Sequence, residues 1–449
     1  MNFGELRPPD AQASRQRPAT LSQQSMGNEF FHRSVLPNGV RVITSAMPTA
    51  RSASVSLYIG TGSRYERDEE AGLSHFLEHL LFKGSRKRPS AKEIAEAIDG
   101  VGGVMNGGTD RELTVYYVKV ARPHLDLALD VLVDLVRHPL LDPAEFEKER
   151  QVILEELAMV ADSPQQLTDL LLDATLWPDQ PLGRDVAGTP DSISALTPEM
   201  AAVCLHRQYV ANNVVIALAG DIDHRQTVDA IEAAVGDWEA GTPSRWFPVI
   251  NGHGPRSGLR YKATEQAHIS IAVRALPLNH PDRYALSFLS IILGEGMSSR
   301  LFLELRESRG LVYDVHTYVT HFLDTGAFTV YAGVEPKNAV ETIQVILEEL
   351  ARIRDEGPTS DELTKARELS KGRLLLRMED TRAVSGWLGA QELLLGEVRG
   401  VDDALAEMEA VTLDDLRRLA RQLLVAEQLY LAVVGPYRSD KRFLPLLRL

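Results

Sequence analysis

The chain has 449 residues, which is too many for one hydrophobic core and predicts roughly two to four domains. Hydrophobic residues make up 44% and charged residues 25%, as in ordinary globular proteins, and no apolar run reaches the ~18 residues of a membrane span. The formal net charge of −15 argues against a nucleic-acid partner, and the single cysteine, Cys204, excludes an internal disulfide framework and favours a reducing, cytoplasmic setting.

Residues 1–27 have the composition of an unstructured tail. The stretch RPPDAQASRQRPATLSQQS is rich in Pro, Ser, Gln and Arg and shows no apolar periodicity. It has no hydrophobic centre, so it does not read as a secretory signal. We therefore expect the first folded domain to begin near residue 28.

The most informative segment is HFLEH, His75 to His79, within the apolar stretch AGLSHFLEHLLFKG. Histidines four positions apart on a helix project from one face, so both imidazoles can reach one zinc ion at the roughly 2.0–2.1 Å that Zn–N bonds require. Glu78 flanks the same face, where a carboxylate can take a proton from a water whose pKa zinc lowers to about 7. The alternative is an amphipathic helix whose histidines are merely buried.

A zinc site needs a third protein ligand and leaves a fourth position open to water. The strongly helical segment EFEKERQVILEELAM, residues 145–159, offers candidates. Its apolar side is marked by Val152, Ile153 and Leu157. Glu149 and Glu156 are two helical turns apart and share a face that borders the apolar one. Charged residues in such places are commonly just the edge of a solvated face, and this is the role expected of Glu155.

HFLEHLLFKG followed at a distance by ERQVILEEL resembles the pitrilysin and insulinase group of metallopeptidases, the inverzincins, in particular its shorter bacterial processing-peptidase-like branch. The signature of this group is an inverted zinc motif plus a distant glutamate. The resemblance implies one zinc ion per chain, held by His75, His79 and Glu156, with Glu78 as the general base. It also implies that Glu149 is the family's second glutamate, which supports the site from behind.

Residues 101–120, VGGVMNGGTDRELTVYYVKV, resemble the glycine-rich turn and edge strand against which substrate lies in this family. This resemblance places Asn106 beside the substrate. The family usually has Asn-Ala where this chain has Asn106-Gly107. Because glycine weakens strand interiors, we expect a looser edge strand here. PLGRDVAGT, residues 181–189, also resembles a family landmark.

The chain contains an internal repeat. Thr197 and Thr412 take the same place in LTPEMAAVCLHRQYVANNVVIALAGDI and VTLDDLRRLARQLLVAEQLYLAVVGPY, each of which continues as a helix and an apolar strand ending in glycine. We therefore predict an α+β fold of two homologous domains, residues 28–240 and 259–449, each an antiparallel-rich sheet packed with helices. A Pro- and Gly-rich linker at 241–258 joins them.

The two copies are not equivalent. Where the first half has SHFLEHLLF, the second has SFLSIILGEG, which offers no ligand, so only the first domain is expected to hold zinc. The second half contains LFLELRESRGLVYDV, which resembles the family segment with an arginine–tyrosine pair that reaches the active site from the other domain. In this chain the pair is Arg306 and Tyr313.

These features predict a zinc endopeptidase that hydrolyses unfolded peptides or leader segments inside a closing chamber. The alternative is a non-catalytic or hetero-oligomeric partner subunit of a processing peptidase, because some relatives have lost the site. His75, Glu78, His79 and Glu156 are all present in this chain, which favours the enzyme over the non-catalytic subunit. Larger members of the family resemble four such domains in one polypeptide, so two copies of this chain are expected to form a homodimer. No nucleic-acid or membrane partner is expected.

Overall fold

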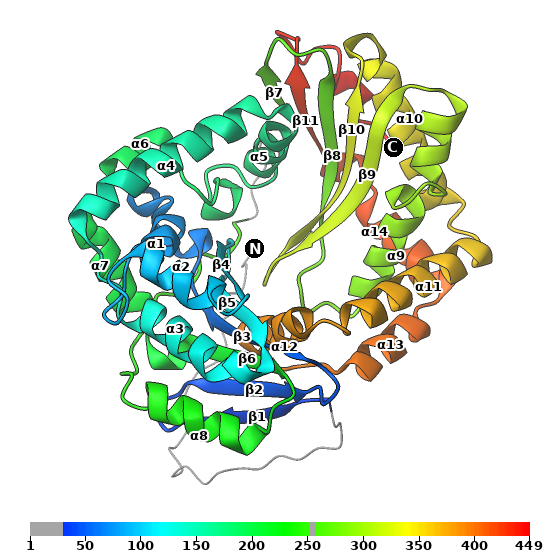
Figure 1. The fold of residues 1–449 in the computed structure, drawn as a ribbon. Coiled ribbons are helices and arrows are strands. Elements are labelled where there is room, and N and C mark those ends of the chain that lie inside the picture. Colours follow the sequence, from blue (N-terminus) through cyan, green and yellow to red (C-terminus); the bar gives the residue numbers. More distant parts are fainter. Residues whose placement is uncertain (1–29, 251–256) are drawn as a thin grey trace, which may run out of the picture.

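The computed structural model describes residues 30–250 and 257–449, and each half of the chain forms one sheet with helices packed on it (Figure 1). The α+β class and the repeat of two similar domains are therefore confirmed. The tail predicted at residues 1–27 lies outside the described residues, and so do residues 251–256 of the predicted linker. Strand β7 begins at Ser257, inside the last two residues of that linker.

The first half is built on a six-stranded sheet in the order β1-β2-β6-β3-β5-β4. Its strands are β1 (His32–Val35), β2 (Arg41–Ala46), β3 (Ser52–Ile59), β4 (Val104–Thr109), β5 (Thr114–Ala121) and β6 (Val214–Gly220). Only β2 and β6 pair in parallel. Strand β4 forms one edge of the sheet, as the glycine-rich segment predicted.

The second half repeats this order without its first strand, as β7-β11-β8-β10-β9. Its strands are β7 (Ser257–Tyr261), β8 (Ala267–Ala275), β9 (Val312–His321), β10 (Gly326–Val334) and β11 (Leu429–Gly435). The pair β7 and β11 is parallel and the others are antiparallel. Strand β9 therefore takes the edge position that β4 has in the first sheet.

Apart from α8, the helices follow a similar order in both halves of the described chain. In the first half they are α1 (Leu73–Leu81), α2 (Ala91–Asp99), α3 (Leu125–Arg137), α4 (Pro143–Asp162), α5 (Pro164–Leu176), α6 (Pro190–Ala195), α7 (Pro198–Gln208) and α8 (His224–Val235). In the second they are α9 (Arg283–Gly294), a π-helix (Phe302–Ser308), α10 (Ala339–Asp355), α11 (Ser360–Arg377), α12 (Thr381–Leu395), α13 (Val401–Ala410) and α14 (Leu413–Leu423). In the second half, helix α9 takes the position that α1 takes in the first half, and it contains no histidine or glutamate.

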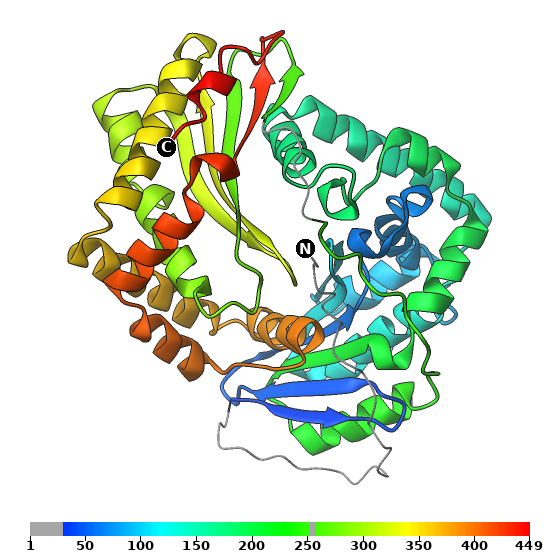
Figure 2. The same cartoon turned by 180° about the vertical axis from the view of Figure 1, so that it is seen from behind.

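The halves exchange one helix each. Helix α12 of the second half packs on β3 and β6 of the first sheet, and α5 of the first half packs on β8 and β11 of the second (Figures 1 and 2). This exchange explains why every residue of β6 is buried. One face of β6 packs in the first-half core, and the other packs against Val384 and Leu388 of α12.

The contact between α12 and the first sheet is close and partly polar. Ser54 and Thr381 share a hydrogen bond of 3.1 Å between their hydroxyl groups, and Ser56 and Ser385 share one of 2.9 Å. A Cβ at Gly389 would lie 2.3 Å from the ring of Tyr58, so the helix can come this near only with glycine there.

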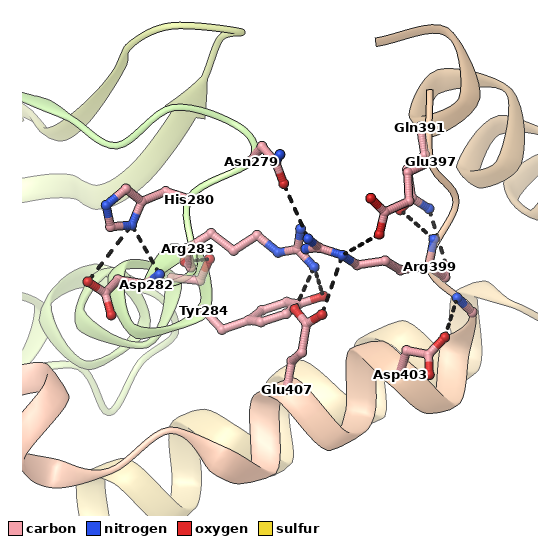
Figure 3. A network of polar contacts seen from close by, with 12 residues as sticks. Asn279, His280, Asp282, Arg283, Tyr284, Gln391, Glu397, Arg399, Asp403 and Glu407 are labelled. Atoms are coloured by element: carbon pink, nitrogen blue, oxygen red, sulfur yellow. Dashed lines mark hydrogen bonds and ion pairs between the residues drawn. The ribbon is translucent and has the colours of Figure 1, made fainter. Parts of the chain in front are cut away.

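Two polar clusters fix the connections around these helices. The start of α9 is tied to α13 by Arg283 and Glu407 (2.8 Å), and Arg399, in the connection between α12 and α13, lies 3.5 Å from the same carboxylate (Figure 3). At the junction of the halves the fully buried Arg64 contacts Glu112 and, from the β9–β10 turn, Asp324, each at 2.5 Å.

Within the described ranges, no helix is long and apolar enough to cross a membrane.

Candidate metal centre

Helix α1, which carries the HFLEH motif, has an external cap. Its N-cap is Gly72, whose φ of 93° lies in the left-handed region and which has no side chain to cap the first turn. Instead the buried carboxylate of Glu66 accepts hydrogen bonds from the N–H groups of Gly72 (2.9 Å) and Ser74 (2.6 Å). An anion at a helix N-terminus satisfies unpaired donors and complements the helix dipole, so Glu66 fixes the turn that carries His75.

The PLGRDVAGT segment closes over this same turn. A Cβ at Gly72 would lie 2.6 Å from Cδ1 of Ile193 and 2.7 Å from the carbonyl oxygen of Ala187, so no other residue fits at position 72. Arg184 donates a hydrogen bond of 2.6 Å to the carbonyl oxygen of Glu66. The segment therefore holds the start of the motif helix in place.

Three side chains converge beside α1. Nε2 of His75 and Nε2 of His79 lie 3.9 and 3.7 Å from Oε2 of Glu156, and all three atoms lie within 4.8 Å of one another. These separations are too long for hydrogen bonds. Ligand atoms at about 2.0–2.1 Å from a tetrahedral zinc ion stand roughly 3.3–3.4 Å apart. The three atoms therefore face a common space that a zinc ion would fill after a small adjustment.

The protonation of His75 suits a metal ligand. Burial, and after it the neighbouring His79, lower the pKa of His75 to about 4. The imidazole is therefore neutral near pH 7 and keeps a lone pair for a metal. Nδ1 of His75 is buried and has no hydrogen-bond partner among the described residues.

Glu149 of α4 stands behind His79. Its side chain is buried, and its Oε2 lies 3.1 Å from Nδ1 of His79. Because a carboxylate only accepts, Nδ1 donates and the lone pair of Nε2 is left facing Glu156. The apolar side of α4 is narrower than the sequence predicted. Val152 is 42% exposed, whereas Ile153 and Leu157 are buried.

Glu78 lies between α1 and the edge strand β4. Thr109 donates a hydrogen bond of 3.1 Å to Oε2 of Glu78, and burial raises the pKa of the Glu78 carboxyl. A Cβ at Gly107 would lie 2.8 Å from Oε1 of Glu78, so glycine lets β4 approach the helix. Strand β4 continues through Gly107, which pairs with Tyr116. Asn106 is exposed on the same strand.

Arg306 and Tyr313 lie next to each other in the second half. Arg306 is in the π-helix, and its guanidinium carbon lies 5.4 Å from the centre of the Tyr313 ring. Tyr313 is on β9 and is 74% exposed, so it is not a core residue. No ion pair of Arg306, and no hydrogen bond from either residue to the metal centre, occurs among the described residues.

Three residues of the centre were missed by sequence reasoning: Glu66, Thr109 and Lys83. Glu66 precedes the N-cap Gly72 by six positions in an acid-rich loop, whereas a capping side chain usually belongs to the N-cap residue itself. Thr109 and Lys83 become neighbours of Glu78 and Glu149 only through tertiary contact. The sequence carries no periodic signal for such contacts.

The fold and the site define a two-domain protein with a candidate zinc centre in the first domain. Residues 41–190 match the family described as Insulinase (Peptidase family M16), and residues 195–370 match the Peptidase M16 inactive domain. A protein of Streptomyces coelicolor named an uncharacterised zinc protease is 38% identical over 436 residues, covering 95% of this chain and 94% of the relative. YmxG of Bacillus subtilis, with the same description, is 37% identical over 407 residues, covering 91% and 98%. The chain therefore belongs to the insulinase family, peptidase family M16.

Solved structures agree on the fold. A protease from Helicobacter pylori superposes with a TM-score of 0.84 at 23% identity, covering 90% of this chain and 99% of that one. A peptidase M16 inactive domain from Pseudomonas fluorescens gives 0.83 at 21% identity, covering 92% and 99%. At these identities the likeness concerns the fold alone. The family and its zinc-protease relatives support zinc binding and a peptidase-type function.

Proposed function

We propose that this chain is a zinc-dependent endopeptidase that hydrolyses unfolded peptides or leader segments. The observation that carries the proposal is the convergence of His75, His79 and Glu156 at separations of 3.7 and 3.9 Å, beside the carboxylate of Glu78. The names of the Streptomyces and Bacillus relatives support the same chemistry.

His75, His79 and Glu156 would hold one zinc ion, which acts as a Lewis acid toward the scissile carbonyl and the attacking water. Glu78 accepts the proton of that water and passes it to the leaving amine. The hydrogen bond from Thr109 keeps the Glu78 carboxylate beside β4.

Substrate binding is proposed at the free edge of β4. Among the described residues this strand pairs only with β5, so its outer N–H and C=O groups can accept a peptide as an added strand. Asn106 is exposed on β4, where it would lie beside the peptide. Main-chain hydrogen bonds select extended, unfolded chains more than particular side chains.

Arg306 and Tyr313 are proposed to act when the two halves close around the peptide. Both are exposed, and β9 is the second-half equivalent of β4. They would donate hydrogen bonds to the oxyanion or to the substrate backbone, which is often worth about 2.7–4 kcal/mol per donor. Closure would thus complete the site.

We further propose a cytoplasmic homodimer. Two copies supply four domains, and one chain carries both the zinc centre and the arginine–tyrosine pair, so a second copy suffices to enclose a substrate. Light scattering at micromolar concentration should give twice the 49.6 kDa of one chain. A stable monomer that cleaves folded and unfolded proteins equally would contradict the enclosed chamber.

The alternative function is a non-catalytic partner subunit. It is supported by the second half of the chain, which matches an inactive domain and whose helix α9 has no residue that could bind zinc. The first half argues against this alternative, because it contains the three residues of the metal centre and the carboxylate of Glu78. An activity measurement separates the two functions.

The test is digestion of unfolded peptides, read by mass spectrometry, with wild type and Glu78→Gln. The wild type should cleave, while Glu78→Gln should lose about 10²–10⁴-fold in rate because the proton acceptor is gone. Both proteins should contain zinc. Glu96→Gln, on the exposed face of α2, is the matched control. An inactive, zinc-bound wild type would favour the subunit function, and full activity of Glu78→Gln would require another base.

A further inference from the structure

The carboxylate of Glu149 is held at both oxygens. Oε2 accepts from Nδ1 of His79 at 3.1 Å, and Oε1 contacts the ammonium group of Lys83 at 2.6 Å. Lys83 follows α1 by two positions, and its backbone N–H donates to the carbonyl oxygen of Leu80 at 3.0 Å. The ammonium group is therefore anchored by the same helix that carries both histidines.

A buried carboxylate is costly unless it is paired with a positive charge. The side chain of Glu149 is 5% exposed. A histidine that ligates a metal is neutral, so His79 does not provide that charge. Within the described ranges, Lys83 is the only lysine or arginine that forms an ion pair with Glu149.

The pairing of Lys83 differs from that of an ordinary surface lysine. Its side chain is 29% exposed and its partner is buried. Lys92 on α2 shows the ordinary case, because it is 79% exposed and reaches the exposed Glu96 at 3.4 Å. An exposed ion pair such as that of Lys92 contributes little to stability, whereas removing one partner of a buried ion pair is strongly destabilising.

We propose that Lys83 is a positioning residue of the metal centre. It holds the Glu149 carboxylate in place, and Glu149 in turn orients the His79 imidazole so that Nε2 faces His75 and Glu156. This inference rests on the proposed zinc site. Outer partners of this kind commonly change metal affinity by about 10–100-fold when they are removed.

The experiment measures the zinc dissociation constant of the full-length chain by competition with a chromophoric chelator. Lys83→Met should weaken zinc binding about 10–100-fold. Lys83→Arg should stay within about threefold of wild type, because it keeps the positive charge that pairs with Glu149. Lys92→Met is the matched control and should bind zinc like wild type.

A double-mutant cycle separates positioning from general stabilisation. In the Glu149→Gln background, adding Lys83→Met should change zinc affinity by less than about twofold, because the Glu149 carboxylate that Lys83 holds is already absent. Circular dichroism checks folding, and Lys83→Gln, which should weaken zinc in the same way, replaces the methionine variant if that one unfolds.

Wild-type zinc affinity in Lys83→Met, or in Lys83→Gln should that replace it, would overturn the inference and leave the zinc site intact. A lysine effect that persists undiminished in Glu149→Gln would overturn it as well, because the effect would then not pass through Glu149. A wild-type chain that binds no zinc would instead overturn the proposed function, and the inference with it.

Discussion

At the scale of single residues, Glu156 is distinguished from its neighbour Glu155 by direction alone. Both lie on α4, and both are acids that could serve a metal. Glu156 Oε2 lies 3.7 Å from Nε2 of His79, while Glu155 is exposed and takes part in no described ion pair. One residue along a helix turns a side chain by about 100°, which is enough to remove it from the site.

We therefore expect Glu156→Gln to weaken zinc binding strongly, since a neutral amide is a poorer ligand than a carboxylate. Glu155→Gln should bind zinc like wild type. Titration with a chelator of known affinity measures both. Equal affinities of the two variants would remove Glu156 from the ligand set.

At the scale of elements, α1 depends on a cap that lies outside it. Glu66 is buried, and burial raises the pKa of its carboxyl to about 7, although the N–H groups of Ser74 and Gly72 and the charge of Arg184 act in the opposite direction. In the unfolded chain the carboxyl has its ordinary value of about 4.3. Between these values the folded state binds more protons than the unfolded state.

The free energy of unfolding should therefore decrease as pH rises from about 4.5 to 7, with at most about 1.4 kcal/mol per pH unit from this one group. Glu66→Gln cannot titrate, so its unfolding free energy should vary less over that interval. Urea unfolding at a series of pH values measures the difference. Glu69→Gln, in the same loop but exposed, should behave like wild type. Identical pH profiles of wild type and Glu66→Gln would disprove a raised pKa.

Strand β9 is the second element with a proposed task. Because Arg306 and Tyr313 contact each other and neither belongs to the group of His75, His79 and Glu156, their loss should affect catalysis without affecting metal content. Arg306→Ala and Tyr313→Phe should each lower kcat/KM at least tenfold, about 1.4 kcal/mol, with unchanged zinc content. Arg309→Ala, an exposed neighbour paired with Glu304, is the control. Near-normal kinetics in both variants would mean that the contact between Arg306 and Tyr313 has no role in catalysis.

The sequence predicted those elements whose signal is periodic or repeated. The motif helix, the glutamate helix, the edge strand and the repeat were all confirmed by the fold. It did not predict Glu66 as a cap, because a capping side chain usually belongs to the N-cap residue itself. It did not predict Lys83 as a partner of Glu149, because these two residues meet only through tertiary contact. Val152 was assigned to the apolar side of its helix because it is apolar, but it is 42% exposed.

At the scale of the whole molecule, the exchange of α5 and α12 joins the halves more firmly than a linker does. Each helix is buried against the other half's sheet, and the fully buried Arg64 adds an ionic tie at the junction. The exchange was not predictable from the repeat, because both helices have the same pattern whichever sheet they cover. Any closing motion must carry α12 with the first sheet.

A chain cut within residues 251–256 should therefore stay one particle under native conditions. An engineered protease site there, followed by size-exclusion chromatography, tests this expectation. Leu388→Asp, which places a charge in the α12 contact, should let the cut fragments separate. Separation of the fragments without that substitution would contradict a firm exchange.

The central claim is that His75, His79 and Glu156 form one zinc site, and metal content tests it most directly. Purified wild-type protein, measured by mass spectrometry of the element, should contain about one zinc per chain. His79→Ala should contain almost none, and His206→Ala, which changes an exposed histidine on α7, should keep the full amount. A folded His79→Ala protein that retains a whole equivalent of zinc would contradict the account.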